Sequence, residues 1–427
     1  MGFVVKKPGV ITTVQDGGRF GYQGSGFSTN GVMDRRAYRI ANLLVENDPN
    51  DPVLEFALAG PTVRFTTNTI FAITGGDFSP TLDGQPVPAY AAIMARRGSI
   101  LRFKASRIGC YGYLAIAGGG VQVPKVMGSC STNLKCEFGG WRGGPLSPGD
   151  YLPFSTKSMD FLPNLGSHRI DGDDEFYQFD RSEITVRVVP GPQEDMFTDR
   201  GVETFYSQPF TVTPKCDRMG YRLDGPEIET KSGSDIISDG IAFGAVQVPS
   251  HGRPIIMLAD RQTTGGYAKI GTVATVDIPR LVQRAPGSKV RFQPVSVQEA
   301  QRLLREEAQL FEQLALKVRR PSADGISPRR TARRLAPILE EQARRCQADT
   351  LWINRASRAE RVGNRNDLKP RPSEPKASHP PTTGQTHPPK PGAQRPSAAD
   401  APHPPESGAQ HPSTPTARAN ETREETA

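Results

Sequence analysis

Residues 111–117 read Tyr-Gly-Tyr-Leu-Ala-Ile-Ala, an aromatic and aliphatic run that ends in the three glycines at 118–120. Similar short runs recur through the first 295 residues, each bounded by Gly, Pro or Asp, with clear examples at 62–65, 70–74, 99–103 and 184–189. Such β-prone runs at short spacing, separated by turn residues, are typical of barrels and sandwiches. The sequence therefore predicts a mainly β protein with a minor share of helix.

One hairpin and two helices punctuate this pattern. The dipeptide Asp83-Gly84 separates two β-prone pairs and favours a hairpin turn. From Met33 to Leu44 apolar residues recur at helical spacing, which predicts a helix. Ser296 and Glu299 have the spacing of a capping box and predict the start of another helix. The apolar residues expected on one face of that helix are Leu303, Leu304, Leu310, Phe311, Leu314 and Val318.

Composition divides the chain into four segments. We expect one β-rich subdomain at 1–160 and a second, with its terminal helix, at 180–318, because the stretch 155–179 is Asp-rich and lacks the β pattern. A basic, helix-prone linker at 319–368 and a Pro-rich tail at 369–427 follow. The tail has no aromatic residue and no aliphatic residue larger than Ala, so it is predicted to be disordered. Its eight-residue repeat, mostly His-Pro, is interpreted as solvated and not as a metal site.

The net charge of +8 would suggest a polyanionic partner, but the excess positive charge is confined to one segment of the chain. Residues 1–318 carry 34 Lys and Arg against 33 Asp and Glu, whereas residues 319–370 carry 13 against 6. A nearly neutral body does not attract nucleic acid, so we expect no nucleic-acid partner. No stretch has the roughly 18 uncharged apolar residues of a membrane span, the start lacks the apolar core of a signal peptide, and the five cysteines form no CxxC pair. We expect a cytoplasmic protein with no metal and no membrane attachment.

Several familiar catalytic motifs are missing from the sequence. It has no GxxxxGK[ST], GxGxxG, GxSxG or HExxH motif, and no Met-Lys-Met tripeptide that would carry biotin. Charged pairs in Gly-rich turns remain, notably Asp217-Arg218 and Asp260-Arg261. Such pairs could bind an anionic or amide-bearing ligand, because Arg offers a planar fork of donors and Gly lets backbone amides approach. The alternative is that they are ion pairs that stabilise turns.

These clusters belong to an ordered set of motifs that spans roughly residues 3–315. In chain order the set includes 12–23 (TTVQDGGRFGYQ), 31–34 (GVMD), 41–45 (ANLLV), 58–62 (LAGPT), 114–119 (LAIAGG), 190–193 (PGPQ), 217–223 (DRMGYRL), 244–249 (GAVQVP) and 258–267 (LADRQTTGGY). The set resembles the carboxyltransferase subunit family. That family includes component C of the ATP-dependent 5-oxoprolinase, the second subunit of allophanate hydrolase and the antagonist KipA.

The resemblance implies a tandem of cyclophilin-like β-barrel subdomains and a part in a multi-subunit hydrolase that opens a cyclic amide. The implied partners are a sister subunit of related fold, the component B or KipI-like protein, and a lactam-binding component A. In the 5-oxoprolinase version, 5-oxo-L-proline, ATP and water give L-glutamate, ADP and phosphate, and ATP could bind the partner protein. We rank this version first, because the body has the length of a single subunit and any biotin would have to be supplied by another chain.

Two alternatives stay open. One is a biotin-dependent carboxyltransferase of the urea and allophanate pathway, in which a carboxyl group moves from carboxybiotin to urea. The other is a KipA-like antagonist, a protein without catalytic activity that binds a KipI-like partner. Neither alternative needs a different fold.

Site residues are assigned at the family motifs from side-chain chemistry. The expected catalytic acids and bases are Asp16, Asp34, Glu55, Asp217 and Asp260. The residues expected to bind the substrate or a phosphoryl group are Arg19, Asn30, Arg218, Gln247, Arg261, Gln262 and Thr264. Arg218 and Arg261 would hold a carboxylate or phosphoryl group, Asp217 or Asp260 would transfer a proton, and Gln247 and Thr264 would position the amide. The members from the first half should face those from the second half across one site.

Overall fold

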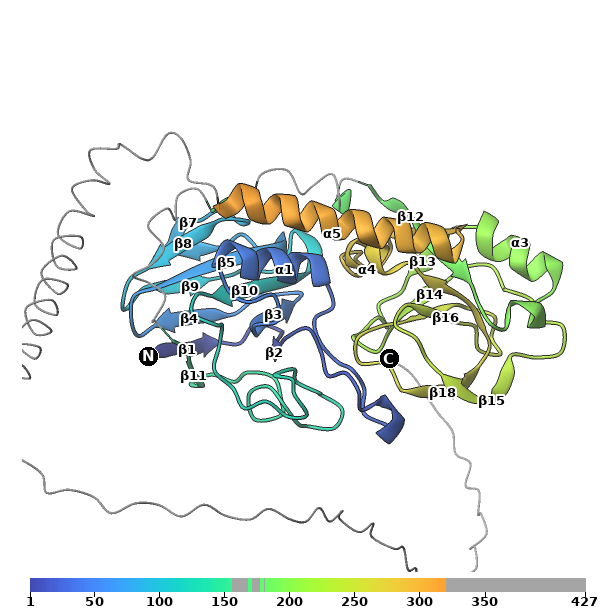
Figure 1. Ribbon diagram of the computed structural model, residues 1–427, viewed down its shortest axis with the longest axis horizontal. Helices are drawn as coiled ribbons and strands as arrows, with labels where there is room; N and C mark the ends of the chain where they lie inside the picture. Colours follow the sequence, from blue (N-terminus) through green and yellow to red (C-terminus); the bar gives the residue numbers. More distant parts are fainter. Residues whose placement is uncertain (156–167, 171–176, 180, 320–427) are drawn as a thin grey trace, which may run out of the picture. The chain divides into compact units, whose positions relative to one another are not determined.

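Antiparallel strands make up most of the molecule. The structure, a computed structural model, describes residues 1–155, 168–170, 177–179 and 181–319, all within one unit of the chain, Met1–Ala343 (Figure 1). This confirms the mainly β class. The predicted boundaries at 160 and 180 lie in or beside segments outside the described residues and stay predictions, as do the basic linker and the Pro-rich tail.

The first half consists of two facing sheets. The six-stranded sheet has the order β11 (Tyr151–Pro153), β1 (Gly2–Lys7), β4 (Thr62–Phe65), β9 (Ile100–Arg102), β6 (Thr81–Leu82) and β7 (Gln85–Pro86). The five-stranded sheet has the order β2 (Ile11–Gln15), β3 (Val53–Ala57), β10 (Ile108–Ile116), β5 (Thr69–Asp77) and β8 (Ala92–Ala95). Phe3 and Phe65 from one sheet and Phe56 and Phe71 from the other are buried in a single core between them. Residues 111–116 of the run at 111–117 lie in β10, which is the central strand of the five-stranded sheet.

Helix α1 (Arg35–Leu44) covers the other face of the five-stranded sheet. It begins two residues later than predicted, because the Asp34 side chain accepts a hydrogen bond from the Ala37 amide and caps the helix. The hydroxyl of Thr74 in β5 donates to the Ala37 carbonyl at 2.7 Å and fixes the helix on the sheet.

The second half contains a closed barrel. Its strands follow the order β12 (Glu183–Pro190), β19 (Lys269–Val273), β16 (Ala245–Gln247), β17 (Ile255–Met257), β14 (Gly220–Asp224), β13 (Phe210–Val212) and β20 (Lys289–Pro294). The pair β15 (Asp235–Gly240) and β18 (Thr264–Tyr267) forms a separate ribbon, and the helices are α3 (Asp199–Ser207) and α4 (Ile278–Val282). The expected tandem is thus one closed barrel preceded by two facing sheets.

Helix α5 (Val297–Arg319) contacts both halves. Figure 1 shows it running beside α1 and past β12. The Ser296 hydroxyl accepts from the Glu299 amide as predicted, but the Glu299 carboxylate pairs with Arg302 in place of reaching back. The predicted apolar face is only partly correct. Phe311 and Val318 are buried, whereas Leu304 and Leu310 point to solvent because α5 meets its neighbours along a narrow line.

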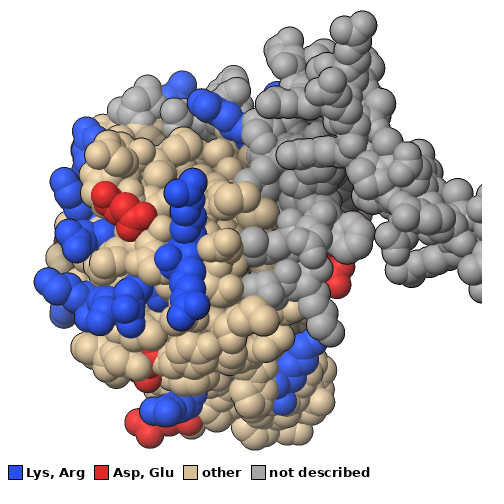
Figure 2. Space-filling view, turned by 90° about the vertical axis from the view of Figure 1, so that its left-hand side faces the viewer, with Lys and Arg blue, Asp and Glu red and all other residues tan. Residues whose placement is uncertain are grey.

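Charge is unevenly distributed over the surface even though the body is nearly neutral. Figure 2 shows the side of the molecule at the left of Figure 1, where Lys and Arg side chains are more prominent than Asp and Glu. Arg64 and Arg102, on neighbouring strands of the six-stranded sheet, are both exposed. Among the described residues, no helix has the length and apolar character to cross a membrane.

The predicted hairpin at Asp83-Gly84 is confirmed and provides a test of the turn. β6 and β7 pair on either side of it, and Gly84 has a φ of 83° with no other group near the position of a Cβ atom. We predict that Gly84→Ala lowers the free energy of unfolding by about 1 kcal/mol, because Ala disfavours this left-handed backbone. Urea denaturation measures the loss.

The matched control is Gly24→Ala, which also adds a methyl group in open space, but at a residue outside the positive-φ set. It should change the free energy of unfolding by less than about 0.5 kcal/mol. Equal losses for the two variants would contradict the backbone explanation.

Candidate functional site

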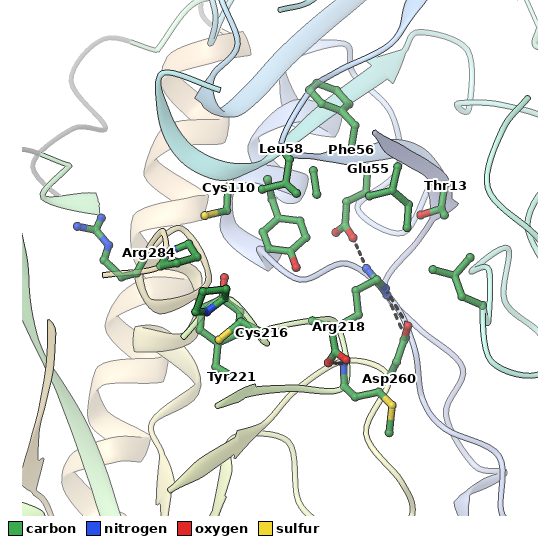
Figure 3. A pocket seen from close by; sticks show the side chains of 18 of the residues that line it. Thr13, Glu55, Phe56, Leu58, Cys110, Cys216, Arg218, Tyr221, Asp260 and Arg284 are labelled. Carbon is green, nitrogen blue, oxygen red and sulfur yellow. Dashed lines mark hydrogen bonds and ion pairs between the residues drawn. The ribbon is translucent and has the colours of Figure 1, made fainter. Parts of the chain in front are cut away.

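A cavity of about 650 Å³ lies between the two halves (Figure 3). Strands β2, β3 and β10 supply one wall, through residues such as Thr13, Glu55 and Cys110. The opposite wall comes from the second half, through residues that include Cys216, Asp217, Arg218, Met219, Tyr221, Asp260 and Arg284. The lining is mostly apolar with a few charged groups, which is the usual composition of a small-molecule site.

Arg218 is the central charged group of this cavity. Its Nε and Nη2 donate to the two oxygens of Asp260 at 2.8 and 3.1 Å, and its Nη1 donates to Glu55 of the first half. Its Nη2 also donates to the Gly31 carbonyl. Burial disfavours the charged guanidinium, but the two carboxylates outweigh this effect and raise the pKa of Arg218. Arg218 therefore joins the two halves as a buried cation between two anions.

Glu55 takes its position from the sheet. In β3 it lies directly opposite Thr13 of β2 and Tyr113 of β10. Its Oε2 accepts from the Tyr113 hydroxyl at 2.8 Å and from the Met33 amide at 2.7 Å, while Oε1 faces Arg218. Burial raises the pKa of Glu55, and Arg218 and the Met33 amide oppose that shift. Its charged form is therefore stabilised by three donors, Arg218, Tyr113 and the Met33 amide, against the effect of burial.

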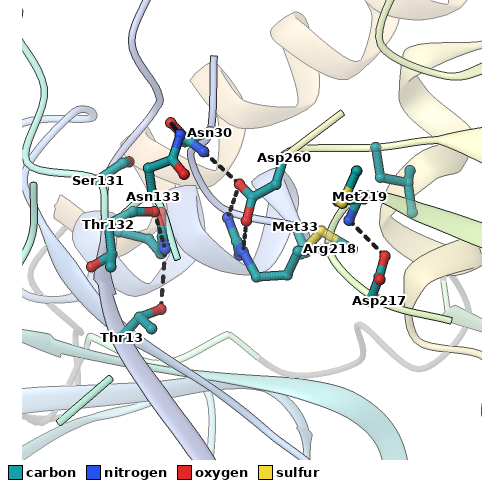
Figure 4. Close-up of polar contacts among 12 residues, drawn as sticks. Thr13, Asn30, Met33, Ser131, Thr132, Asn133, Asp217, Arg218, Met219 and Asp260 are labelled. Atoms are coloured by element: carbon teal, nitrogen blue, oxygen red, sulfur yellow. Dashed lines mark hydrogen bonds and ion pairs between the residues drawn. The ribbon is translucent and has the colours of Figure 1, made fainter. Parts of the chain in front are cut away.

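Asn30 extends the charged group into the first half. Its Nδ2 donates to Asp260 at 2.8 Å (Figure 4). Its Oδ1 accepts from Arg19 at 2.7 Å and from Asn133 at 3.3 Å. Asn30 has a φ of 53°, a backbone region that Asn tolerates better than most residues. A polar chain thus runs from Arg19 through Asn30 and Asp260 to Arg218.

Asp16 and Arg19 organise a loop and do not line the cavity. The Asp16 carboxylate accepts from the hydroxyls of Ser129 and Ser131 and from the Cys130 amide. Arg19 is fully buried and donates to the carbonyls of Val126 and Ser131 in addition to Asn30. Both side chains are engaged by protein groups, so the geometry supports a structural task for them.

The remaining predicted residues fall into two groups. Asp217 lines the cavity, but its Oδ1 accepts from the Met219 and Gly220 amides, which makes it a turn-forming residue. The others lie outside the described lining: Asp34 caps α1, Gln247 and Arg261 are buried elsewhere, and Gln262 and Thr264 are exposed. Arg261 donates to the Ile241 and Leu258 carbonyls and to Thr29, and burial lowers its pKa to about 10.

Sequence reasoning missed several residues of the site. Tyr113 contacts Glu55, Lys135 and Cys110 line the cavity, and Gln283 links Asp34 to the Tyr111 carbonyl. For Tyr113 there was a signal, because a polar end on an otherwise apolar central strand must find a partner. For Lys135 there was none, since one Lys in a loop is common.

Gly75 and Gly120, in two of the glycine-rich segments, are closely packed. A Cβ atom at Gly75 would lie 2.4 Å from the Tyr111 carbonyl oxygen, and one at Gly120 would lie 2.0 Å from the Pro52 carbonyl oxygen. These glycines therefore serve close packing of backbone against backbone. Within the described ranges no cluster of three or more His, Cys, Asp or Glu side chains could hold a metal ion.

The chain is similar to a known protein family, to two known proteins and to a solved structure. The family described as "Carboxyltransferase domain, subdomain A and B" matches residues 25–294. The chain is 38% identical to component C of the 5-oxoprolinase of Escherichia coli over 72% of its own length and 96% of that protein, and 37% identical to the same component from Haemophilus influenzae over 71% and 94%. Among solved structures it resembles the urea amidolyase of K. lactis, with a TM-score of 0.67 and 29% identity over 73% of this chain and 20% of that one.

The buried charges make Arg218 a strong test of the interface between the halves. We predict that Arg218→Met lowers the free energy of unfolding by about 3–5 kcal/mol, because Glu55 and Asp260 then lose their buried cation. Urea denaturation provides the measurement.

Arg222→Met is the control. Arg222 is 44% exposed and lies 4.0 Å from Asp217, so its loss should cost no more than about 1 kcal/mol. A mild effect of Arg218→Met would show that the two carboxylates need no such partner.

The cysteines allow a test of accessibility at the cavity. Cys136 is exposed, Cys216 is half-buried with its pKa raised by burial, and burial raises the pKa of Cys110 and of Cys130 to about 11. Because the thiolate is the reactive form, we predict that, of these four described cysteines, iodoacetamide at pH 8 labels Cys136 first, Cys216 more slowly, and Cys110 and Cys130 least. Peptide mass spectrometry over time measures the order. Labelling in urea should remove it, and native labelling of Cys110 at the rate of Cys136 would contradict the prediction.

Proposed function

The chain belongs to the family of carboxyltransferase domains with subdomains A and B, and from this premise we propose that it is component C of an ATP-dependent 5-oxoprolinase complex. The reaction proposed is the hydrolysis of 5-oxo-L-proline to L-glutamate. The observation that carries the proposal is the match to component C of the E. coli 5-oxoprolinase, which extends over 96% of that protein. A match along nearly the whole of a separate subunit favours the same division of labour between chains.

The cavity between the halves supports a reaction on a small amide. Opening a lactam requires a donor to its carbonyl oxygen and a group that supplies a proton to the departing nitrogen. Hydrogen bonds within the described residues occupy four of the five N–H groups of Arg218, and the second hydrogen of Nη1 is left over. We assign that N–H to the substrate carbonyl. Asp260 is a carboxylate beside Arg218, so it would take a proton from the attacking water as the C–O bond forms and return that proton to the nitrogen as the C–N bond breaks. Glu55 would fix the guanidinium.

In this proposal ATP and any biotin are bound by other chains. The packed glycines at Gly75 and Gly120 do not fit a triphosphate, so we derive no step on this chain that involves ATP. The proposed partners are a sister subunit of related fold, which would complete the nucleotide site, and a lactam-binding component. Biotin would enter only on a further chain.

Carboxyl transfer is the second candidate function. It is favoured by the family description and by the structural likeness to the urea amidolyase. The chain corresponds to only 20% of that protein, so the likeness covers one part of a larger enzyme. This candidate ranks below the hydrolase for that reason.

We predict that Asp260→Asn lowers kcat for glutamate release by about 100-fold or more in a complex reconstituted from the full chain and its partner proteins, because the variant loses the proposed proton-transfer group. The assay follows glutamate formed from 5-oxoproline and ATP. A thermal melt of the variant separates this effect from loss of folding, since Asp260 also binds Arg218.

Asp224→Asn is the matched control. It also removes one negative charge in the second half, but Asp224 is 71% exposed, forms an exposed ion pair with Arg253 and accepts from the Gly225 amide. Its kcat should equal that of the wild type. Full activity of a folded Asp260→Asn complex would refute the assignment, and the absence of turnover in every wild-type combination would refute the function.

A further inference from the structure

We propose that Lys135 is the specificity-determining residue of the cavity and that it binds the carboxylate of an anionic lactam. The proposal rests on the proposed function, because it concerns the substrate of that same site. It concerns a residue outside the motifs that define the family resemblance. It rests on the charges that line the cavity, on the contacts that each lining cation already makes, on the hydrogen bonds that hold the loop of Lys135, and on the charge of the substrate.

The charged groups of the cavity wall balance one another. Its anions are Glu55, Asp217 and Asp260, and its cations are Lys135, Arg218 and Arg284. A substrate that brings a further negative charge into a mostly apolar cavity needs a cation that can pair with it. The question is which of the three cations is free to do so.

The two arginines are committed to the protein. Arg218 lies between two carboxylates and already has more negative charge around it than it can neutralise. Arg284 donates to four backbone carbonyls, those of Tyr177, Gln178, Arg181 and Arg280. A carboxylate would have to compete with these acceptors at Arg284, and the remaining N–H of Arg218 is the one assigned to the lactam carbonyl.

Lys135 is free by comparison. Its side chain forms no hydrogen bond or ion pair with any described residue, and it is exposed although it lines the cavity, which places it at the rim. A Lys side chain offers three donors on a flexible stem and can follow a small ligand. Its charge is therefore not already neutralised by any anion among the described residues.

The loop that carries Lys135 is anchored to the charged centre. The Asn133 Oδ1 accepts from the backbone amides of Lys135 and Cys136 at 3.1 and 2.9 Å. The Asn133 Nδ2 donates to Asn30, which in turn donates to Asp260. This chain ties the backbone of Lys135 to the Asp260–Arg218 pair, and all three residues line the same cavity.

The chemistry of the candidate substrates makes this arrangement a filter. 5-Oxoproline combines a lactam carbonyl with a carboxylate, whereas urea carries no charge. The lactam carbonyl would meet Arg218 while the carboxylate meets Lys135. A neutral amide would gain nothing from Lys135, so this residue distinguishes an acidic lactam from a neutral one.

The test uses the reconstituted complex with the full chain and two substrates, 5-oxoproline and its neutral analogue 5-oxoprolinamide. For Lys135→Gln we expect KM for 5-oxoproline to rise about tenfold or more, the usual effect of losing one charge-assisted contact. The kcat should stay within about threefold, and KM for the amide should not change. Lys135→Arg should restore most of the affinity, because it keeps the charge.

Lys125→Gln is the matched control. It removes the same charge from an exposed residue ten positions earlier that is not part of the cavity lining. Both kinetic constants should equal those of the wild type. Protection of Cys216 from iodoacetamide by 5-oxoproline, lost in Lys135→Gln, gives a second readout that does not depend on turnover.

The outcomes separate the two hypotheses. Wild-type turnover with an unchanged KM in Lys135→Gln, or an equal rise in KM for the amide, would overturn the role of Lys135 and leave the proposed function in place. A wild-type complex that neither binds nor converts 5-oxoproline would overturn the proposed function, and with it the acidic lactam as the ligand of Lys135.

Discussion

Burying one arginine is the constraint on which the relation between the two halves depends. Arg218 can be desolvated only with anions at hand, and it takes one, Asp260, from its own half and the other, Glu55, from the five-stranded sheet. The Gly31 carbonyl adds a third acceptor. The second half therefore supplies the cation that Glu55 of the first half needs, and Glu55, Arg218 and Asp260 all line the cavity.

Local features of the fold were predictable because they depend on neighbouring residues. The Asp83-Gly84 turn, the strand at 62–65 and the long run in β10 are determined by backbone preference and apolar pattern. Features that depend on contacts between residues far apart in the sequence could not be predicted. The start of α1 depends on Asp34, and the solvent exposure of Leu304 depends on how little of α5 meets the body.

The candidate site shows the same division. The sequence identified Arg218, Asp260 and Glu55 as members of one site, although Glu55 and Arg218 are 163 positions apart. It could not assign their tasks, because a guanidinium in a glycine-rich turn looks the same whether it faces a ligand or a carbonyl. Arg261 and Arg218 have similar surroundings in the sequence, yet Arg261 donates to two backbone carbonyls while Arg218 borders the cavity.

The contacts of α5 also bear on the order in which the molecule is assembled during translation. The ring centre of Phe311 lies 3.7 Å from the guanidinium carbon of Arg39, and Glu307 pairs with Arg36, so the helix is fastened to α1 near the start of the chain. At about 5–20 residues added per second, roughly 15 to 60 seconds separate the synthesis of α1 from that of α5. Only two residues separate the last barrel strand, β20, from α5, so the barrel and the helix are completed almost together. During that interval α1 therefore lacks both the finished second half and the helix that fastens to it.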